Sequence, residues 1–110
     1  MMSAEYVDFH CLSPGAVIEV QTKNRHYQIK CLGGDAIRIS GHPEYCPDPV
    51  PAHLQGSTDK SGVLEPSRIG RGMYLKFVLD GRLPVTTSRV LSIHVNVPPE
   101  SSATSHISLC

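Results

Sequence analysis

Two histidines and a cysteine lie close together in HPEYCPDPVPAHLQGS, at residues 42–57. His42, Cys46 and His53 are of the types that bind zinc, and a thiol beside an imidazole can act as a nucleophile. Structural zinc sites need three or four ligands, usually in closely spaced pairs. No Cys-x-x-Cys or His-x-x-x-His pair occurs here, and prolines stiffen the segment. We therefore predict no bound metal and no cofactor.

Catalysis by a thiol is the alternative function. The chain has four cysteines and six histidines, so Cys46 and His53 could form a catalytic pair. Cys31 alternates with apolar residues and is expected in the core, where a thiol is unreactive. No Gly-x-Ser-x-Gly motif is present. We predict no catalytic residue, and keep a small thiol- or metal-dependent enzyme using Cys46 and His53 as the alternative.

The charge balance limits the class of partner. The 110 residues include ten Lys and Arg and ten Asp and Glu, which gives a formal net charge of zero. Proteins that bind nucleic acids usually carry a basic excess, so a nucleic-acid-binding barrel is only the second alternative. The N-terminus lacks a secretory pattern, and no apolar run is long enough to span a membrane. We expect a cytoplasmic protein with free thiols, in which homo-oligomers are possible.

Alternation of apolar and polar residues predicts β-strands. It runs through GAVIEVQT, RHYQIKC, DAIRIS, GMYLKFVLD and RVLSIHVNV. Short joins predict a three-stranded meander over residues 16–40. Asp80-Gly81 predicts a two-residue turn in a hairpin over residues 72–88, followed by a final strand over about 90–97. Pro84 predicts an edge or a bulge in the return arm.

The middle of the chain, residues 41–71, is rich in proline and glycine and is predicted to be a long insertion. GVLE and SRIG are its best candidates for short strands, and PAHLQG for one helical turn. The predicted fold is all-β, a small SH3-like or related half-open barrel of five to six short antiparallel strands. Residues 1–97 form this single domain, and residues 98–110 form a flexible polar tail.

Four stretches of the sequence are similar to a group of short bacterial all-β proteins with no assigned function. These stretches are LSPGAVIEVQTKNRHYQI, the Gly-Ser at 56–57, IGRGMYLKF and TSRVLSI. The pattern of the group is Pro-Gly, Val-x-Val-x-Thr, Gly-Ser, Ile-Gly-x-Gly and Thr-Ser-x-Val-x-x-Ile, matched over about residues 12–95. The resemblance implies a bacterial all-β protein and brings no activity with it.

The predicted function is a non-catalytic binding module with a protein or small-molecule partner and no role in the membrane. Loops on a rigid β scaffold often carry binding residues. The GRG at 70–72 offers backbone donors to an anion, and Tyr74 and Lys76 share a wet strand face. The hydroxyls of TTSR, at 86–89, could bind an anion or satisfy backbone groups at a corner. The candidate binding residues are Arg71, Tyr74, Lys76, Gly56, Ser57, Thr87 and Ser88.

Overall fold

Ten short strands make up most of the chain that the computed structural model describes, which is residues 2–44, 46–79 and 84–97. A single 3-10 turn, η1, spans Phe9–Cys11. The strands are β1 (Met2–Ala4), β2 (Tyr6–Asp8), β3 (Val17–Thr22), β4 (His26–Gly33), β5 (Ala36–Ser40), β6 (Val50–Thr58), β7 (Leu64–Pro66), β8 (Arg68–Gly70), β9 (Tyr74–Leu79) and β10 (Val85–Asn96).

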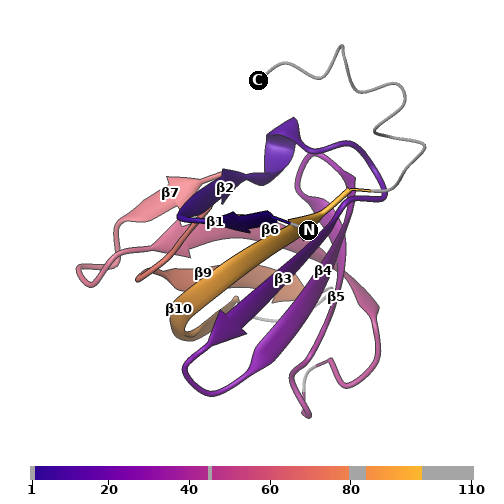
Figure 1. Cartoon of the computed structure of the whole chain (residues 1–110). Helices are drawn as coiled ribbons and strands as arrows, with labels where there is room; N and C mark the ends of the chain where they lie inside the picture. The colour runs from indigo at the N-terminus through magenta and orange to yellow at the C-terminus, as the bar shows by residue number, and fades with distance from the viewer. Residues whose placement is uncertain (1, 45, 80–83, 98–110) are drawn as a thin grey trace.

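Six of these strands form a closed antiparallel barrel (Figure 1). Hydrogen bonding runs from β10 through β3, β4 and β5 to β6, and β9 closes the ring by pairing with both β6 and β10. β1 adds to β10 and β7 adds to β6, while β2 and β8 form a separate two-stranded sheet. The predicted all-β barrel is confirmed, and the ring is closed rather than half-open.

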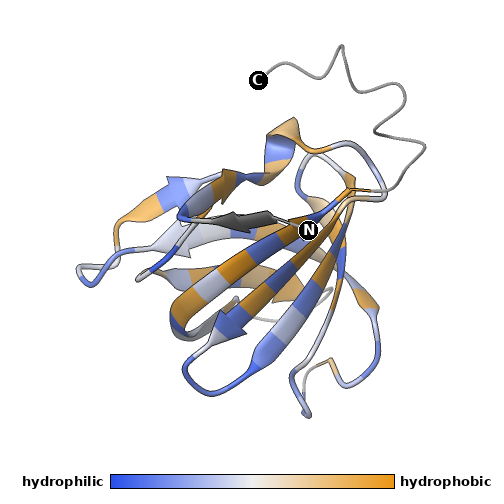
Figure 2. Cartoon of the chain, in the orientation of Figure 1, coloured by the Kyte–Doolittle hydropathy of each residue, from blue (hydrophilic) through white to orange (hydrophobic). Residues whose placement is uncertain are grey.

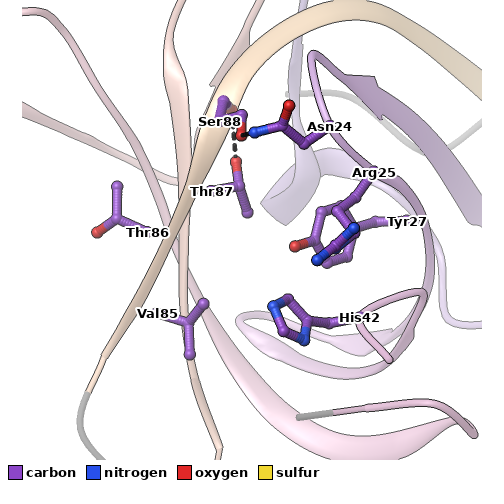
Figure 3. A pocket seen from close by; sticks show the side chains of 8 residues that line it. All are labelled: Asn24, Arg25, Tyr27, His42, Val85, Thr86, Thr87 and Ser88. Atoms are coloured by element: carbon purple, nitrogen blue, oxygen red, sulfur yellow. Dashed lines mark hydrogen bonds between the residues drawn. The ribbon is translucent and has the colours of Figure 1, made fainter. Parts of the chain in front are cut away.

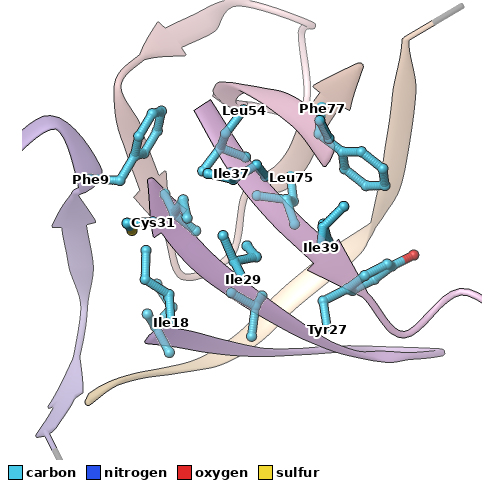
Figure 4. Close-up of a cluster of buried hydrophobic side chains, with 14 of the residues drawn as sticks. Phe9, Ile18, Tyr27, Ile29, Cys31, Ile37, Ile39, Leu54, Leu75 and Phe77 are labelled. Carbon is cyan, nitrogen blue, oxygen red and sulfur yellow. The ribbon is translucent and has the colours of Figure 1, made fainter. Parts of the chain in front are cut away.

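The alternation of the sequence fills the barrel. Figure 2 shows apolar and polar residues taking turns along the strands. Inward side chains such as Ile18, Ile29, Ile39 and Phe77 are completely buried (Figure 4). At about 25 cal/mol per Å² of apolar surface, this burial is the main stabilising term. The interior is a packed core, so ligand contacts belong to the ends and outer faces of the barrel.

The meander over residues 16–40 is confirmed as β3, β4 and β5. GVLE and SRIG do supply short strands, β7 and β8. Two other expectations fall outside the described residues. These are the Asp80-Gly81 turn and the polar tail at 98–110.

The predicted helical turn in PAHLQG is wrong, and residues 41–71 are no simple insertion. β6 is a barrel strand that buries Ala52 and Leu54 and exposes Pro51 and His53. Leu54 N donates to Asp35 O at 2.8 Å on the β5 side, so Pro51, three residues earlier, faces the β9 side. Among the described residues, pairing with β9 begins at Ala52, so Pro51 removes no donor from that ladder.

The separate return arm and final strand are also corrected, because β10 runs continuously from Val85 to Asn96. Register shifts between Thr86 and Arg89, and between Val90 and Ser92, let one strand pair first with β9 and then with β3. The predicted bulge in this arm is confirmed, with Pro84 just before it.

The connection after β5 depends on Gly41. Its φ is +129°, and a Cβ there would collide with the backbone oxygen of His26. Gly41 N donates to Cys46 O at 2.9 Å, and Cys46 N donates to His42 O at 3.0 Å. Close approach to β4 and a positive φ both require glycine here.

We predict that Gly41→Ala destabilises the fold more than Gly33→Ala. Gly33 has nearly the same φ, +130°, but a Cβ added there would meet no atom within 4 Å, so it controls for backbone strain. Strain alone costs about 1–2 kcal/mol in either variant, and the contact at Gly41 adds at least about 1 kcal/mol. Urea denaturation monitored by circular dichroism measures both. Equal losses of stability would contradict the close approach.

Candidate functional site

The alternate connections of a meander lie at the same end of its barrel. The β3–β4 turn, residues 23–25, and the β5–β6 connection, residues 41–49, therefore meet near the start of β10. A cavity of about 190 Å³, which we call the mouth pocket, opens there (Figure 3). Its lining residues are Asn24, Arg25, Tyr27, His42, Val85, Thr86, Thr87 and Ser88.

Tyr27 is the most unusual residue of the mouth pocket. The side chain is 2% exposed, and its ring packs edge-on against Phe77 with centroids 6.0 Å apart. The hydroxyl points out of the core into the pocket, and no described residue bonds it (Figures 3 and 4). Burial raises the pKa of Tyr27 to about 12; Cys46 adds to the rise and Arg25 opposes it. The hydroxyl is thus a protonated donor without an acceptor.

Arg25 has a fixed backbone and an unpaired side chain. Thr22 Oγ1 accepts from Arg25 N at 2.9 Å and donates to Arg25 O at 3.0 Å. Thr22 N also donates to Arg25 O, at 2.8 Å. The guanidinium forms no ion pair or hydrogen bond with any described residue. A rigid turn therefore holds a free cation at the pocket wall.

The Ser88 hydroxyl and the His42 imidazole line the same space. Asn24 Nδ2 donates to Ser88 Oγ at 2.5 Å, which leaves the Ser88 hydroxyl hydrogen available. His42 Nδ1 accepts from Glu44 N at 3.1 Å. This bond helps to hold the His42 imidazole in the wall of the pocket.

The mouth pocket thus suits an acceptor-rich, negatively charged group. The described residues of its lining supply a guanidinium, an imidazole, an amide and several hydroxyls, and none of them is a carboxylate. Oxyanions accept several charge-assisted hydrogen bonds from such donors. The volume is below the range of about 300–1,000 Å³ typical of sites for drug-sized ligands, so the pocket fits one chemical group.

The predicted residues of the TTSR segment lie at this pocket. Thr87 Oγ1 accepts from Leu75 N at 3.2 Å and donates to Ser88 O at 2.7 Å, so Thr87 satisfies backbone groups. Ser88 keeps a free donor. Thr86 points away from Arg25 and His42 (Figure 3).

The other predicted binding residues lie elsewhere. Tyr74 and Lys76 are half-buried on the outer face of β9. Arg71 precedes this strand, and its Nη1 lies 2.6 Å from Glu5 Oε1. Ser57 is completely buried: Ser57 Oγ donates to Arg68 O at 2.8 Å and accepts from Gly70 N at 3.2 Å.

Gly56, next to Ser57, is buried too. A Cβ on Gly56 would collide with the backbone oxygen of Glu65. Gly56 and Ser57 therefore hold β7 and β8 against β6, which is a structural role.

The structure separates Cys46 from His53. Cys46 is fully buried, burial raises the pKa of its thiol, and its protonated form is a poor nucleophile. His53 lies on the outer face of β6. Among the described residues, no group of three or more His, Cys, Asp or Glu is placed to hold a metal ion.

Sequence reasoning missed Asn24, Arg25, Tyr27 and His42 as a group. The alternation of β4 places Tyr27 in the core, which is correct for its ring. A usable signal was present, because alternate turns of a meander share one end of a barrel. That rule brings the Lys23-Asn24 turn to the connection carrying His42.

We predict that Tyr27→Phe leaves stability at neutral pH unchanged within about 1 kcal/mol, or raises it, because the lost hydroxyl has no partner. At high pH the variant should become more stable than the parent, because only the parent has a hydroxyl that loses its proton. Tyr27 titrates near 10 when unfolded and about 12 when folded, so the unfolded chain loses the proton first. Below pH 10 this group therefore takes no stability from the parent, and as pH rises from 10 towards 12 the parent progressively loses stability.

Urea denaturation of both proteins from pH 7 to 12 measures this difference. Cys31, whose pKa is raised to about 11 by burial, is present in both and cancels. A clear loss of stability in Tyr27→Phe at pH 7 would instead reveal a hydrogen-bond partner.

We also predict slow alkylation of Cys46. Iodoacetamide at pH 8 followed by peptide mass spectrometry should find Cys31 and Cys46 at least about tenfold less modified in the folded protein than in urea, since both thiols are buried and their pKa values are raised. Fast modification of folded Cys46 would support the thiol enzyme.

No helix among the described residues is long and apolar enough to cross a membrane. Comparison with protein-family models, with curated proteins and with solved structures gave no match.

Proposed function

We propose that the protein is a non-catalytic binding module that holds an anionic group of a protein or small-molecule partner in the mouth pocket. The observation that carries this proposal is the pairing of two donors at the pocket: the Tyr27 hydroxyl, which faces the pocket while its ring is buried, and the Arg25 guanidinium beside it. Neither donor has an acceptor among the described residues. An oxyanion bound there would accept a hydrogen bond from each of them.

Binding has better support than catalysis. A nucleophile needs an adjacent base, and the buried Cys46 thiol is not paired with His53, which faces outwards. The Tyr27 hydroxyl, with a pKa of about 12, is a donor and not a base at neutral pH. A cytoplasmic, bacterial setting and an SH3-like relationship belong to the same proposal. The expectation that the thiols are free holds for Cys31 and Cys46 and is wrong for Cys11, which is disulfide-bonded.

We predict that phosphate and acetate bind at the mouth pocket. In a nitrogen-15 NMR titration of the whole chain, chemical-shift changes should concentrate at Asn24, Arg25, Tyr27, His42 and Ser88. If both anions cause these changes, the pocket accepts any oxyanion. If only phosphate causes them, the pocket is specific for a tetrahedral oxyanion. Tyr27→Phe and Arg25→Gln should each weaken binding about tenfold, because each removes a hydrogen bond to a charged group.

Arg38→Gln is the matched control. Arg38 is an exposed arginine on β5, which lies three strands from β10 in either direction around the ring. This variant should bind as the parent does. The site would be refuted if the chemical-shift changes spread over all basic residues. It would also be refuted if Tyr27→Phe and Arg25→Gln both bind as the parent does.

A further inference from the structure

A row of cationic side chains runs across the outer face of β3, β10 and β9. Lys23 N donates to Arg89 O at 2.9 Å, so the turn after β3 lies against β10 at this point. Arg89 is opposite Tyr74 on β9, and Thr86 is opposite Lys76. Opposed residues of an antiparallel pair project from the same face. We call Lys23, Arg89 and Lys76 the cationic row.

The cationic row is not neutralised within the described chain. None of its three side chains forms an ion pair with a described residue. Glu5 lines the same hollow as Arg89, but its carboxylate is engaged by Arg71 at 2.6 Å. Neighbouring like charges on a sheet face are destabilising. The chain as a whole has no net charge, so the excess of positive charge on this face is local. Such a face attracts an acidic partner.

The cationic row joins two hollows along one strand. Residues 85–88 of β10 line the mouth pocket, and residues 89–91 line a second, shallower hollow of about 350 Å³. Ser88 and Arg89, one in each lining, are adjacent in sequence. The two hollows are therefore neighbours along β10. A ligand that occupied both would have to be elongated and would pass Arg89.

We infer that the partner is an acidic polypeptide segment bound in extended form along β10, with one carboxylate in the mouth pocket and further carboxylates on the cationic row. This inference rests on the proposed function. An extended chain advances about 3.3 Å per residue and points alternate side chains to one side, so alternate acidic residues would face the row.

Single-stranded nucleic acid fits this face less well. Such ligands stack their bases on exposed aromatic side chains. Tyr74, the aromatic residue of this face, is only half-exposed. Tyr6 is exposed, but the Arg68 guanidinium lies 4.5 Å from the centre of its ring.

Fluorescence anisotropy of the whole chain with a labelled peptide of alternating glutamate and serine tests the inference. Lys23→Glu/Arg89→Glu should weaken binding at least about tenfold, because it replaces attraction with repulsion. The control is Lys30→Glu/Arg38→Glu, which changes net charge equally. Lys30 and Arg38 are also a cross-strand cationic pair, but on β4 and β5, away from the pocket. The control should lose less than about threefold.

Lys76→Glu alone is a second variant, for use if Lys23→Glu/Arg89→Glu does not fold. It should also weaken binding of the peptide. Free glutamate and a labelled oligouridine complete the design. The inference is supported if the peptide binds at least about tenfold more tightly than glutamate and more tightly than oligouridine. It is overturned if both double variants weaken the peptide equally, or if oligouridine binds more tightly with steep salt dependence.

The proposed function and the inference can fail separately. If glutamate binds, Tyr27→Phe abolishes that binding, and the peptide binds no more tightly than glutamate, then the mouth pocket is a binding site and the inference of a polypeptide partner is wrong. If glutamate, phosphate and the peptide all fail to bind, both the proposed function and the inference are wrong.

Discussion

The pairing of β10 with two different neighbours closes the barrel, and the rest of the structure depends on it. β10 bonds to β9 over its first residues and to β3 over its later ones, with a register shift within each pairing. Bulges increase the bend and twist of a strand, so a single segment can serve both neighbours. Closure removes the free edges that a six-stranded open sheet would expose. It also brings the β3–β4 turn against the start of β10, where the mouth pocket lies.

A packed interior explains why the candidate site is at the end of the barrel. Among the described residues, the inward side chains of the ring pack into one buried cluster. Tyr27 belongs to this core and also reaches the mouth pocket. Its ring contributes to the core against Phe77, and its hydroxyl is left in the pocket without an acceptor.

Much of the architecture follows from the sequence because period-two alternation is explicit there. The meander, β9 and the later part of β10 all alternate apolar and polar residues. β6 was hidden because prolines surround it and Ala52 is only weakly apolar. Its prediction requires knowing that the donor missing at Pro51 faces away from β5, and only the register of the sheet gives this. The mouth pocket was hidden for a similar reason: its residues come from three segments, and the start of β10 reaches the two meander connections only when the barrel closes.

Gly56 and Ser57 show how a residue can matter to a surface that it never reaches. Ser57 bonds both Arg68 O and Gly70 N, and Gly56 lets Glu65 O approach where a side chain would stand. These contacts fix the course of β8 into the turn that carries Arg71. Arg71 in turn binds the carboxylate of Glu5 and the carbonyl of Leu91, so Glu5 is held there and does not neutralise Arg89. The buried Gly-Ser thus helps to keep the cationic row unpaired, which is the property that an acidic partner would recognise.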